Sequence, residues 1–190
     1  MVDIPKTPED FLNIAIIHKN ELKNGGLVSA SSIEFIKYFY EKINSYKSII
    51  LMVYRDSGSK INAFILCSTK HDDVYKKFLK QNLSALIKFK SLFFLLVKTA
   101  FKRALSRGFS HYESELVNIA VEKDSRRKGI AKMLIWSAEE LMRSMNIHEY
   151  FLQVLASNSS AVNLYQDLGF NIVESIHSGN KLKYLMKKVI

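Results

Sequence analysis

The chain has 190 residues, of which 48% are hydrophobic and 24% charged, and its formal net charge is +10. This composition is typical of one globular domain with a real core and disfavours a disordered chain. The single cysteine, Cys67, excludes an internal disulfide and favours a reducing, cytoplasmic location. We expect no signal peptide, and the longest apolar run, residues 92–97, is far too short to span a membrane.

The first part of the chain predicts two helices followed by a β-hairpin. Residues 7–22 show helical spacing of apolar side chains after Thr7, a residue type that often caps a helix, and residues 29–45 repeat this spacing. Residues 48–54 and 61–69 are apolar runs rich in β-branched side chains, separated by a polar turn.

Residues 70–110 concentrate the positive charge of the chain. They hold ten Lys and Arg against two acidic residues, so the rest of the chain is nearly neutral. Their apolar side chains recur at helical spacing, which predicts a basic, amphipathic helical insertion. Its basic face could meet an anionic substrate, a membrane surface or only water, and we expect no nucleic-acid partner. The apolar face of residues 83–105 is compatible with packing within one chain or with a homodimer.

The last part of the chain alternates strands and helices. Residues 115–121, 149–156 and 170–176 predict strands, and residues 125–145 and 158–168 predict the helices between them. Residues 181–189 predict a final strand at the edge of the sheet. The alternation predicts an α/β (α+β) domain with a central sheet that is parallel where helices connect neighbouring strands.

A basic turn, Arg126 to Lys128, stands between a predicted strand and Gly129 at the start of a predicted helix. Unpaired amides and a partial positive charge at a helix start, together with glycine, are typical of phosphate binding. Three cations there oppose the helix dipole unless an anion joins them. Taken alone, the turn is better interpreted as a solvated basic surface. Its spacing matches neither the Rossmann dinucleotide fingerprint nor the P-loop.

This turn and the strand before it resemble motif A of the GCN5-related N-acetyltransferase (GNAT) superfamily. The signature Arg/Gln-x-x-Gly-x-Gly/Ala reads Arg126-x-x-Gly129-x-Ala131 here, and the sequence SNSSAVNLYQDLGF, residues 157–170, resembles motif B. The resemblance covers about residues 113–177. It implies a single N-acetyltransferase domain over residues 1–190, with a mixed, mostly antiparallel sheet of about six to seven strands flanked by helices.

The resemblance implies acetyl-coenzyme A as co-substrate. We expect no metal, because the five scattered histidines and the single cysteine show no metal-ligand spacing. The pyrophosphate is expected on the backbone amides of motif A, and the thioester between the strands that carry Val121 and Leu155. A backbone amide near Ile119 or Ala120 would polarise the thioester carbonyl. The implied donor-binding residues are Ile119, Ala120, Val121, Arg126, Arg127, Lys128, Gly129, Ile130, Ala131, Lys132, Asn158, Ala161 and Tyr165.

The resemblance also suggests catalytic residues. Tyr165, seven residues after Asn158, corresponds to the tyrosine general acid of the family. The ribosomal-protein N-terminal alanine acetyltransferases, which share the sequences NIAV and ASN, have a glutamate where this chain has Gln153, and glutamine cannot accept a proton. Glu115 and Glu113 are therefore the candidate bases, acting through water, although an acceptor amine of low pKa needs no strong base.

Asn118 lies within an apolar strand and could bind the acceptor or the cofactor. A hydrogen bond to a neighbouring backbone group is the favoured interpretation.

Three function classes stay open from the sequence. The first, which we favour, is transfer of acetyl to a primary amine of a small molecule, such as a nucleotide-linked amino sugar, by direct attack in a ternary complex. The second is acetylation of a protein N-terminus of the ribosomal-protein alanine type, which the glutamine at position 153 disfavours. The third is a non-catalytic module that docks on a membrane or partner through residues 70–110, which the intact motifs disfavour.

Overall fold

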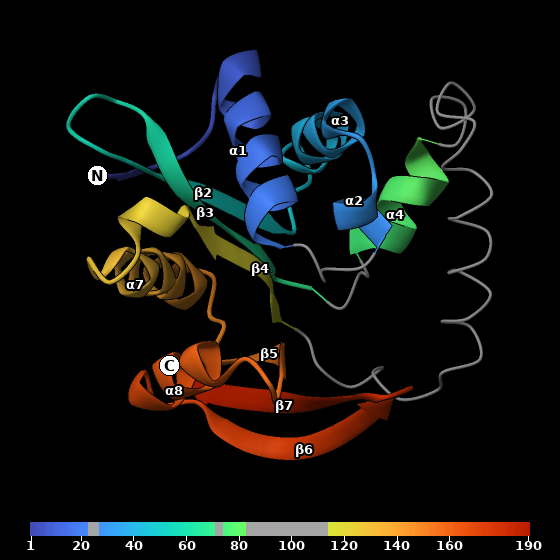
Figure 1. Cartoon of the computed structure of the whole chain (residues 1–190), viewed down its shortest axis with the longest axis vertical. Coiled ribbons are helices and arrows are strands. Elements are labelled where there is room, and N and C mark those ends of the chain that lie inside the picture. Colours follow the sequence, from blue (N-terminus) through green and yellow to red (C-terminus); the bar gives the residue numbers. More distant parts are fainter. Residues whose placement is uncertain (23–26, 71–73, 83–113) are drawn as a thin grey trace.

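A computed structural model describes residues 1–22, 27–70, 74–82 and 114–190 (Figure 1). A seven-stranded sheet in the order β1-β2-β3-β4-β5-β7-β6 forms its centre. The strands are β1 Val2–Asp3, β2 Ile49–Arg55, β3 Ile61–Ser68, β4 Glu115–Val121, β5 Glu149–Leu155, β6 Asn171–Ser178 and β7 Lys181–Val189. The helices are α1 Pro8–Glu21, α2 Leu27–Ala30, α3 Ile33–Ile43, α4 Val74–Gln81, α7 Ile130–Ser144 and α8 Ser159–Asp167, with a short 3-10 helix, η1, at Lys123–Ser125.

Local signals explain where the first helices begin. Thr7 caps α1 in a capping box, because its hydroxyl accepts from the Asp10 amide while the Asp10 carboxylate accepts from the Thr7 amide. Ser32 caps α3 by accepting from the Phe35 amide. The predicted cap at Thr7 and the predicted antiparallel hairpin of β2 and β3 are both confirmed.

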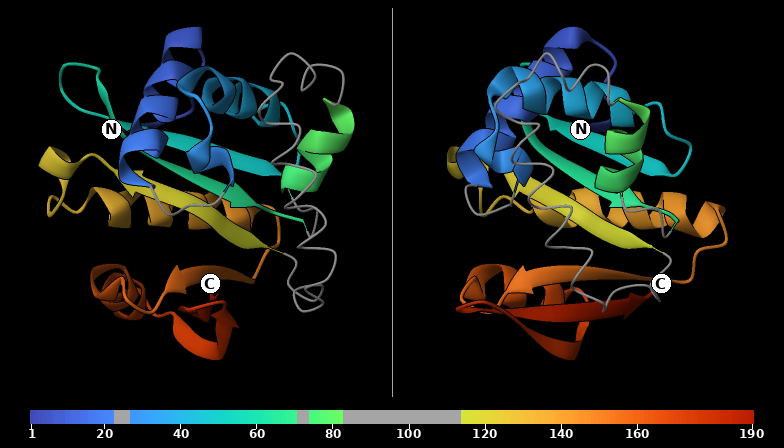
Figure 2. Two further views of the ribbon diagram at one scale, coloured as in Figure 1. Left: turned by 45° about the vertical axis from the view of Figure 1, so that its right-hand side comes forward. Right: turned by 90° about the vertical axis from the view of Figure 1, so that its right-hand side faces the viewer.

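Two hydrophobic cores lie on opposite faces of the sheet, because successive side chains of each strand point to opposite faces. Helices α1 and α3 cover one face, over Phe64 and Leu66 of β3. Helix α7 covers the other face, over Ile65 and Cys67 of the same strand. Figure 2 shows these layers from two further sides. The fold is the mixed, mostly antiparallel sheet flanked by helices that the sequence predicts, since β4 and β5 form its parallel pair.

The parallel pair β4–β5 is the feature that positions the site. The two strands pair only at Glu115 with Phe151 and at Leu116 with Leu152, and then separate. Figure 2 shows β4, in yellow, rising away from β5, in orange. We call the space between the two strands beyond these pairs the β4–β5 opening. At the same point the β3–β4 register shifts between Leu66 and Cys67, which leaves Val117 as an extra, bulged residue in β4.

The first bound of one predicted helix and the place of one predicted strand are wrong. The helix predicted over residues 125–145 begins at Ile130, beside the Gly129 expected at its start, because residues 123–125 form η1 and the basic turn bends through left-handed conformations at Arg127 and Gly129. The strand predicted at the edge, β7, lies between β5 and β6, and β6 forms the edge. The physical reason is burial, since Leu185 and Met186 in the middle of β7 are buried whereas Ile172 and Val173 of β6 are exposed.

The predicted insertion at residues 70–110 is described only in part. Helix α4 lies within it, and the predicted helices over residues 83–105 lie outside the described residues. Within the described ranges, no helix combines the length and apolar character that crossing a membrane requires.

Candidate active site

The start of α7 forms an open cradle of backbone amides, which we call the donor cradle (residues 126–132). Gly129 precedes the helix with φ of +76°, and Arg127 also has a positive φ, of +63°. The first intrahelical hydrogen bond runs from the Met133 amide to the Gly129 carbonyl at 3.1 Å. The amides of the preceding residues therefore face out of the helix end, as at every helix start.

The space above Gly129 fits an anionic group. A Cβ atom built on this glycine meets no other described atom within 4 Å. The side chains of Arg127 and Lys128 are exposed at its rim. An open approach to backbone amides, a helix N-terminus and nearby cations together fit a pyrophosphate.

The third cation of the turn has a different environment. The Arg126 guanidinium donates to the Glu21 carboxylate at the end of α1 and, through Nε, to the Val121 carbonyl at 3.1 Å. The Arg126 amide donates to the Lys123 carbonyl at 3.3 Å, and the Lys123 amide donates to Glu21 Oε1 at 3.3 Å. Arg126 thus fastens the turn to α1. Glu21 was not predicted as a partner of the turn, since nothing in the sequence signals a contact between residues 105 positions apart.

The β4–β5 opening presents one edge of β4 without a strand partner. Ile119 and Val121 direct their side chains toward the α7 face, and Ala120 toward the face of α1 and α3. These three residues, predicted to bind the donor, follow the bulge at Val117 along this edge. An extended arm that pairs with the β4 backbone would run from the donor cradle toward the closed end of the opening at Leu116.

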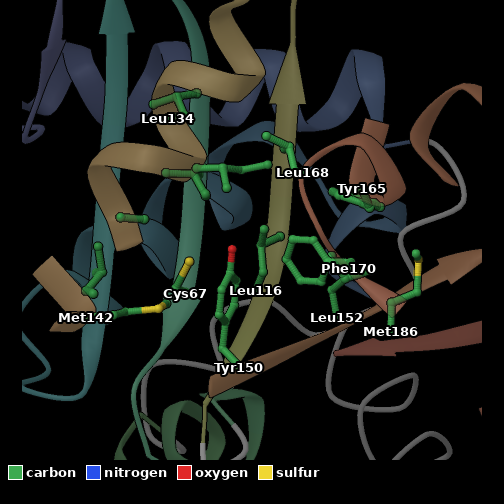
Figure 3. Close-up of a cluster of buried hydrophobic side chains, with 14 of the residues drawn as sticks. Cys67, Leu116, Leu134, Met142, Tyr150, Leu152, Tyr165, Leu168, Phe170 and Met186 are labelled. Carbon is green, nitrogen blue, oxygen red and sulfur yellow. The ribbon is translucent and has the colours of Figure 1, made fainter. Parts of the chain in front are cut away.

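Helix α8 carries the residues of the second motif. The Asn158 side chain caps the helix by accepting from the Ala161 amide at 3.3 Å, and both residues lie at its first turn. Tyr165 is 6% exposed and packs edge-on against Phe170 with ring centroids 5.6 Å apart. Figure 3 shows Tyr165 beside Leu168 and Phe170 in the core that also contains Leu116 of β4.

The environment of Tyr165 keeps its hydroxyl protonated. Burial, with a smaller contribution from Cys67, raises the pKa of Tyr165 to about 12. The Cys67 thiol is itself fully buried, and burial raises its pKa as well. A protonated hydroxyl can donate a proton but cannot serve as a base at neutral pH.

The candidate bases are placed differently. Glu115 is the half-buried first residue of β4, opposite Ser68 and Phe151, at the closed end of the β4–β5 opening. Glu113 lies outside the described residues. Gln153 is exposed on β5, opposite Leu185 of β7, beyond the last β4–β5 pair.

The interpretation favoured for Asn118, a hydrogen bond to a neighbouring backbone group, is wrong. Its Nδ2 donates to the Tyr40 hydroxyl at 3.3 Å rather than to a neighbouring backbone carbonyl. The side chain therefore connects β4 to α3 across the face covered by α1 and α3.

The chain is similar to three known proteins, to one in sequence and to two in fold. A [ribosomal protein bS18]-alanine N-acetyltransferase from Salmonella typhimurium is 39% identical over 59 residues, which are 31% of this chain and 40% of that protein. The matched segment thus spans well under half of that relative. The solved ribosomal-protein-alanine N-acetyltransferase from Brucella melitensis superposes with a TM-score of 0.66 and 14% identity, covering 100% of this chain and 99% of the other.

The third is the PaiA N-acetyltransferase from Thermoplasma acidophilum, solved in complex with coenzyme A. It has a TM-score of 0.57 and 17% identity, covering 100% of this chain and 99% of the other. At these identities the two solved structures show a shared fold. The family is shown by sequence, because residues 90–170 match the model of the Acetyltransferase (GNAT) family, whose enzymes use acetyl-coenzyme A. The match spans β4, the donor cradle, α7, β5 and α8, and this chain is a member of the GNAT acetyltransferase superfamily.

Proposed function

We propose that this chain is an acetyl-coenzyme A-dependent N-acetyltransferase that acts on a primary amine. The observation that carries the proposal is the separation of β4 from β5 directly beside the open helix start at Gly129. Such an arrangement would suit a pyrophosphate at the helix start and an extended arm along the unpaired edge of β4. The family match over residues 90–170 supports the same reading.

Bound acetyl-coenzyme A supplies the acetyl group as a thioester, whose carbonyl carbon a neutral amine attacks while the C–S bond breaks. The amides of Ile130, Ala131 and Lys132 would hold the pyrophosphate, with the rim cations adding charge. The Tyr165 hydroxyl, protonated because its pKa is raised to about 12, would give its proton to the departing sulfur. It would regain one from the amine nitrogen through water, so no net proton is consumed.

The acceptor that we propose is the α-amine of a protein N-terminus. The Salmonella and Brucella proteins reported above are ribosomal-protein alanine N-acetyltransferases, and they support this acceptor over the small-molecule amine that the sequence analysis favours. An α-amine has a pKa of about 7.7–8.0, against about 10.4 for a lysine side chain. A useful fraction is therefore neutral at physiological pH, and such an acceptor tolerates Gln153 in place of a glutamate base.

A small-molecule amine, such as a nucleotide-linked amino sugar, is the second candidate. The observation that favours it is Gln153 itself, exposed on β5 beyond the last β4–β5 pair, where the N-terminal alanine enzymes have a glutamate. The basic composition of residues 70–110 would suit an anionic acceptor of this kind.

A thiol-release assay separates the two acceptors. Purified protein with acetyl-coenzyme A receives a short peptide beginning with alanine, the same peptide with its N-terminus already acetylated, or a nucleotide-linked amino sugar. We expect thiol release with the free peptide and none with the blocked peptide. Release with the amino sugar alone would favour the second candidate. Absence of release with every amine, together with no binding of acetyl-coenzyme A, would contradict the proposed function.

A further inference from the structure

Three buried polar side chains form a hydrogen-bonded chain that ends on Asn118. Ser29 of α2, His18 of α1 and Tyr40 of α3 are 5%, 1% and 0% exposed. His18 Nε2 lies 2.7 Å from Ser29 Oγ, and His18 Nδ1 lies 2.7 Å from the Tyr40 hydroxyl. The Tyr40 hydroxyl in turn lies 3.3 Å from Asn118 Nδ2. We call these four residues the buried polar chain.

The chemistry of Asn118 sets the direction of every hydrogen bond in the buried polar chain. Its Nδ2 can only donate, so the Tyr40 oxygen accepts. Because Tyr40 is fully buried, its O–H donates to its other hydrogen-bond partner, His18 Nδ1. His18 therefore carries its proton on Nε2 and donates it to Ser29 Oγ. This requires a neutral imidazole, and burial, aided by the Lys19 charge, lowers the pKa of His18 to about 4.

The surroundings hold the buried polar chain in place. The His18 ring stacks on Phe64 of β3, with centroids 6.2 Å apart and planes 11° apart. The Tyr40 ring meets the same phenylalanine edge-on at 5.2 Å. With Nδ2 committed to Tyr40, the amide of Asn118 cannot rotate without losing that bond. Its oxygen, Oδ1, therefore points away from Tyr40.

Asn118 lies where the reaction would take place. It is the second residue of β4 beyond the last pair with β5, and it directly follows the bulge at Val117. It is half-buried, so part of the residue is exposed at the surface. Its side chain lies on the face opposite α7, because Nδ2 donates to Tyr40 of α3.

We propose that Asn118 binds the acceptor amine, with Oδ1 accepting a hydrogen bond from its N–H, and that Tyr40 and His18 are the positioning residues that fix this oxygen. The proposal rests on the proposed function. A primary amine has two N–H bonds and one lone pair, so binding one N–H to a fixed oxygen limits the directions of the lone pair. The buried polar chain thereby makes Asn118 a determinant of acceptor binding rather than of donor binding.

Steady-state kinetics with the alanine-starting peptide test this assignment. Asn118→Ala should lower kcat/KM for the peptide about tenfold, mainly through KM, the size expected for loss of one hydrogen bond. Its calorimetric Kd for acetyl-coenzyme A should match that of the wild type. Asn118→Asp keeps the size and an acceptor oxygen but lacks the N–H that donates to Tyr40, so it should recover the peptide KM only in part.

A double-mutant cycle tests the role of Tyr40. Tyr40→Phe should raise the peptide KM less than Asn118→Ala, and the double variant should be no worse than Asn118→Ala alone. Tyr150→Phe is the matched control. It removes another buried tyrosine hydroxyl, bonded to Glu139 at 2.6 Å in the other core, and should leave the peptide KM unchanged.

NMR spectroscopy gives a readout that does not depend on turnover. The side-chain amide signal of Asn118 should shift when the alanine peptide is added to protein saturated with coenzyme A, and should not shift with the acetylated peptide. Long-range ¹H–¹⁵N spectra should show His18 as the neutral Nε2–H tautomer. A peptide kcat/KM unchanged in Asn118→Ala, in a protein whose wild type binds acetyl-coenzyme A and acetylates the peptide, overturns this inference alone. A wild type that does neither overturns the proposed function and this inference with it.

Discussion

The Glu21 carboxylate at the end of α1 pairs with the Arg126 guanidinium of the donor cradle and also accepts the Lys123 amide. Arg126 is the first residue of the Arg-x-x-Gly-x-Ala signature, and its side chain is anchored on the protein rather than directed into solvent alone. One carboxylate therefore holds two points of the turn that precedes Gly129. These hydrogen bonds hold the turn against α1 in the absence of a bound donor.

Replacing Glu21 should weaken donor binding without affecting the acceptor. Glu21→Gln removes the charge that holds Arg126, so the turn loses its anchor and the Kd for acetyl-coenzyme A should rise about three- to tenfold. Glu122→Gln is the control, because it removes a more exposed ion pair, to Lys60 at 2.8 Å, close to the same turn. Calorimetry measures both. Equal affinity in the wild type and Glu21→Gln would show that the pair does not shape the cradle.

A side chain at position 129 should prevent acetyl-coenzyme A from binding. Gly129→Glu adds bulk and negative charge at a left-handed position where a Cβ points into the open cradle. The affinity for acetyl-coenzyme A should therefore fall at least a hundredfold, which corresponds to about 3 kcal/mol of binding free energy. Gly179→Glu is the control for backbone strain, since Gly179 has φ of +59° and similarly open surroundings in the turn before β7. It should lower stability comparably and leave the Kd unchanged. Near-wild-type affinity in Gly129→Glu would place the pyrophosphate elsewhere.

Tyr165→Phe should lower turnover far more than binding. Phenylalanine preserves the packing on Phe170 and removes the proton donor, so kcat should drop about ten- to ten-thousand-fold while the Kd for acetyl-coenzyme A stays constant. Because the pKa of Tyr165 is raised to about 12, its hydroxyl stays protonated throughout the neutral range, and its ionisation should not limit the rate below about pH 11. An unchanged kcat would assign Tyr165 to packing.

His18 should make the fold sensitive to mild acid. Its pKa is lowered from 6.5 to about 4, so the unfolded chain binds the proton more readily than the folded chain. The contribution of the neutral ring is complete above about pH 6.5 and is lost as the pH falls toward 4, by about 3 kcal/mol in all. Urea unfolding of the wild type and His18→Gln at several pH values isolates this contribution, since the other titrating groups are common to both. Parallel stability curves between pH 6.5 and 4 would mean that His18 titrates normally.

Short-range signals made much of this molecule predictable. Thr7 and Asp10 are three residues apart, and their capping box follows from residue type and spacing. Strand β4 was predicted with its observed bounds because an apolar run between polar turns defines it. The donor cradle was predicted as a helix start because Gly129 separates a basic turn from helical spacing.

Long-range relationships were not predictable from one sequence. The order of β6 and β7 depends on which strand is buried beside β5, and both sequences read as strands of similar length. The Glu21–Arg126 pair joins residues 105 positions apart, and the Tyr40–Asn118 bond joins residues 78 positions apart. No local pattern distinguishes these side chains from solvated or core residues of the same type, because their partners are brought together only by the packing of α1 and α3 on the sheet.

Calorimetric titration of the protein with acetyl-coenzyme A is the most direct test of the central claim. The wild type should bind one equivalent, and Gly129→Glu should abolish the heat of binding while remaining folded. Absence of binding by the wild type at millimolar concentration would contradict the assignment of the donor cradle and of the transferase function that rests on it.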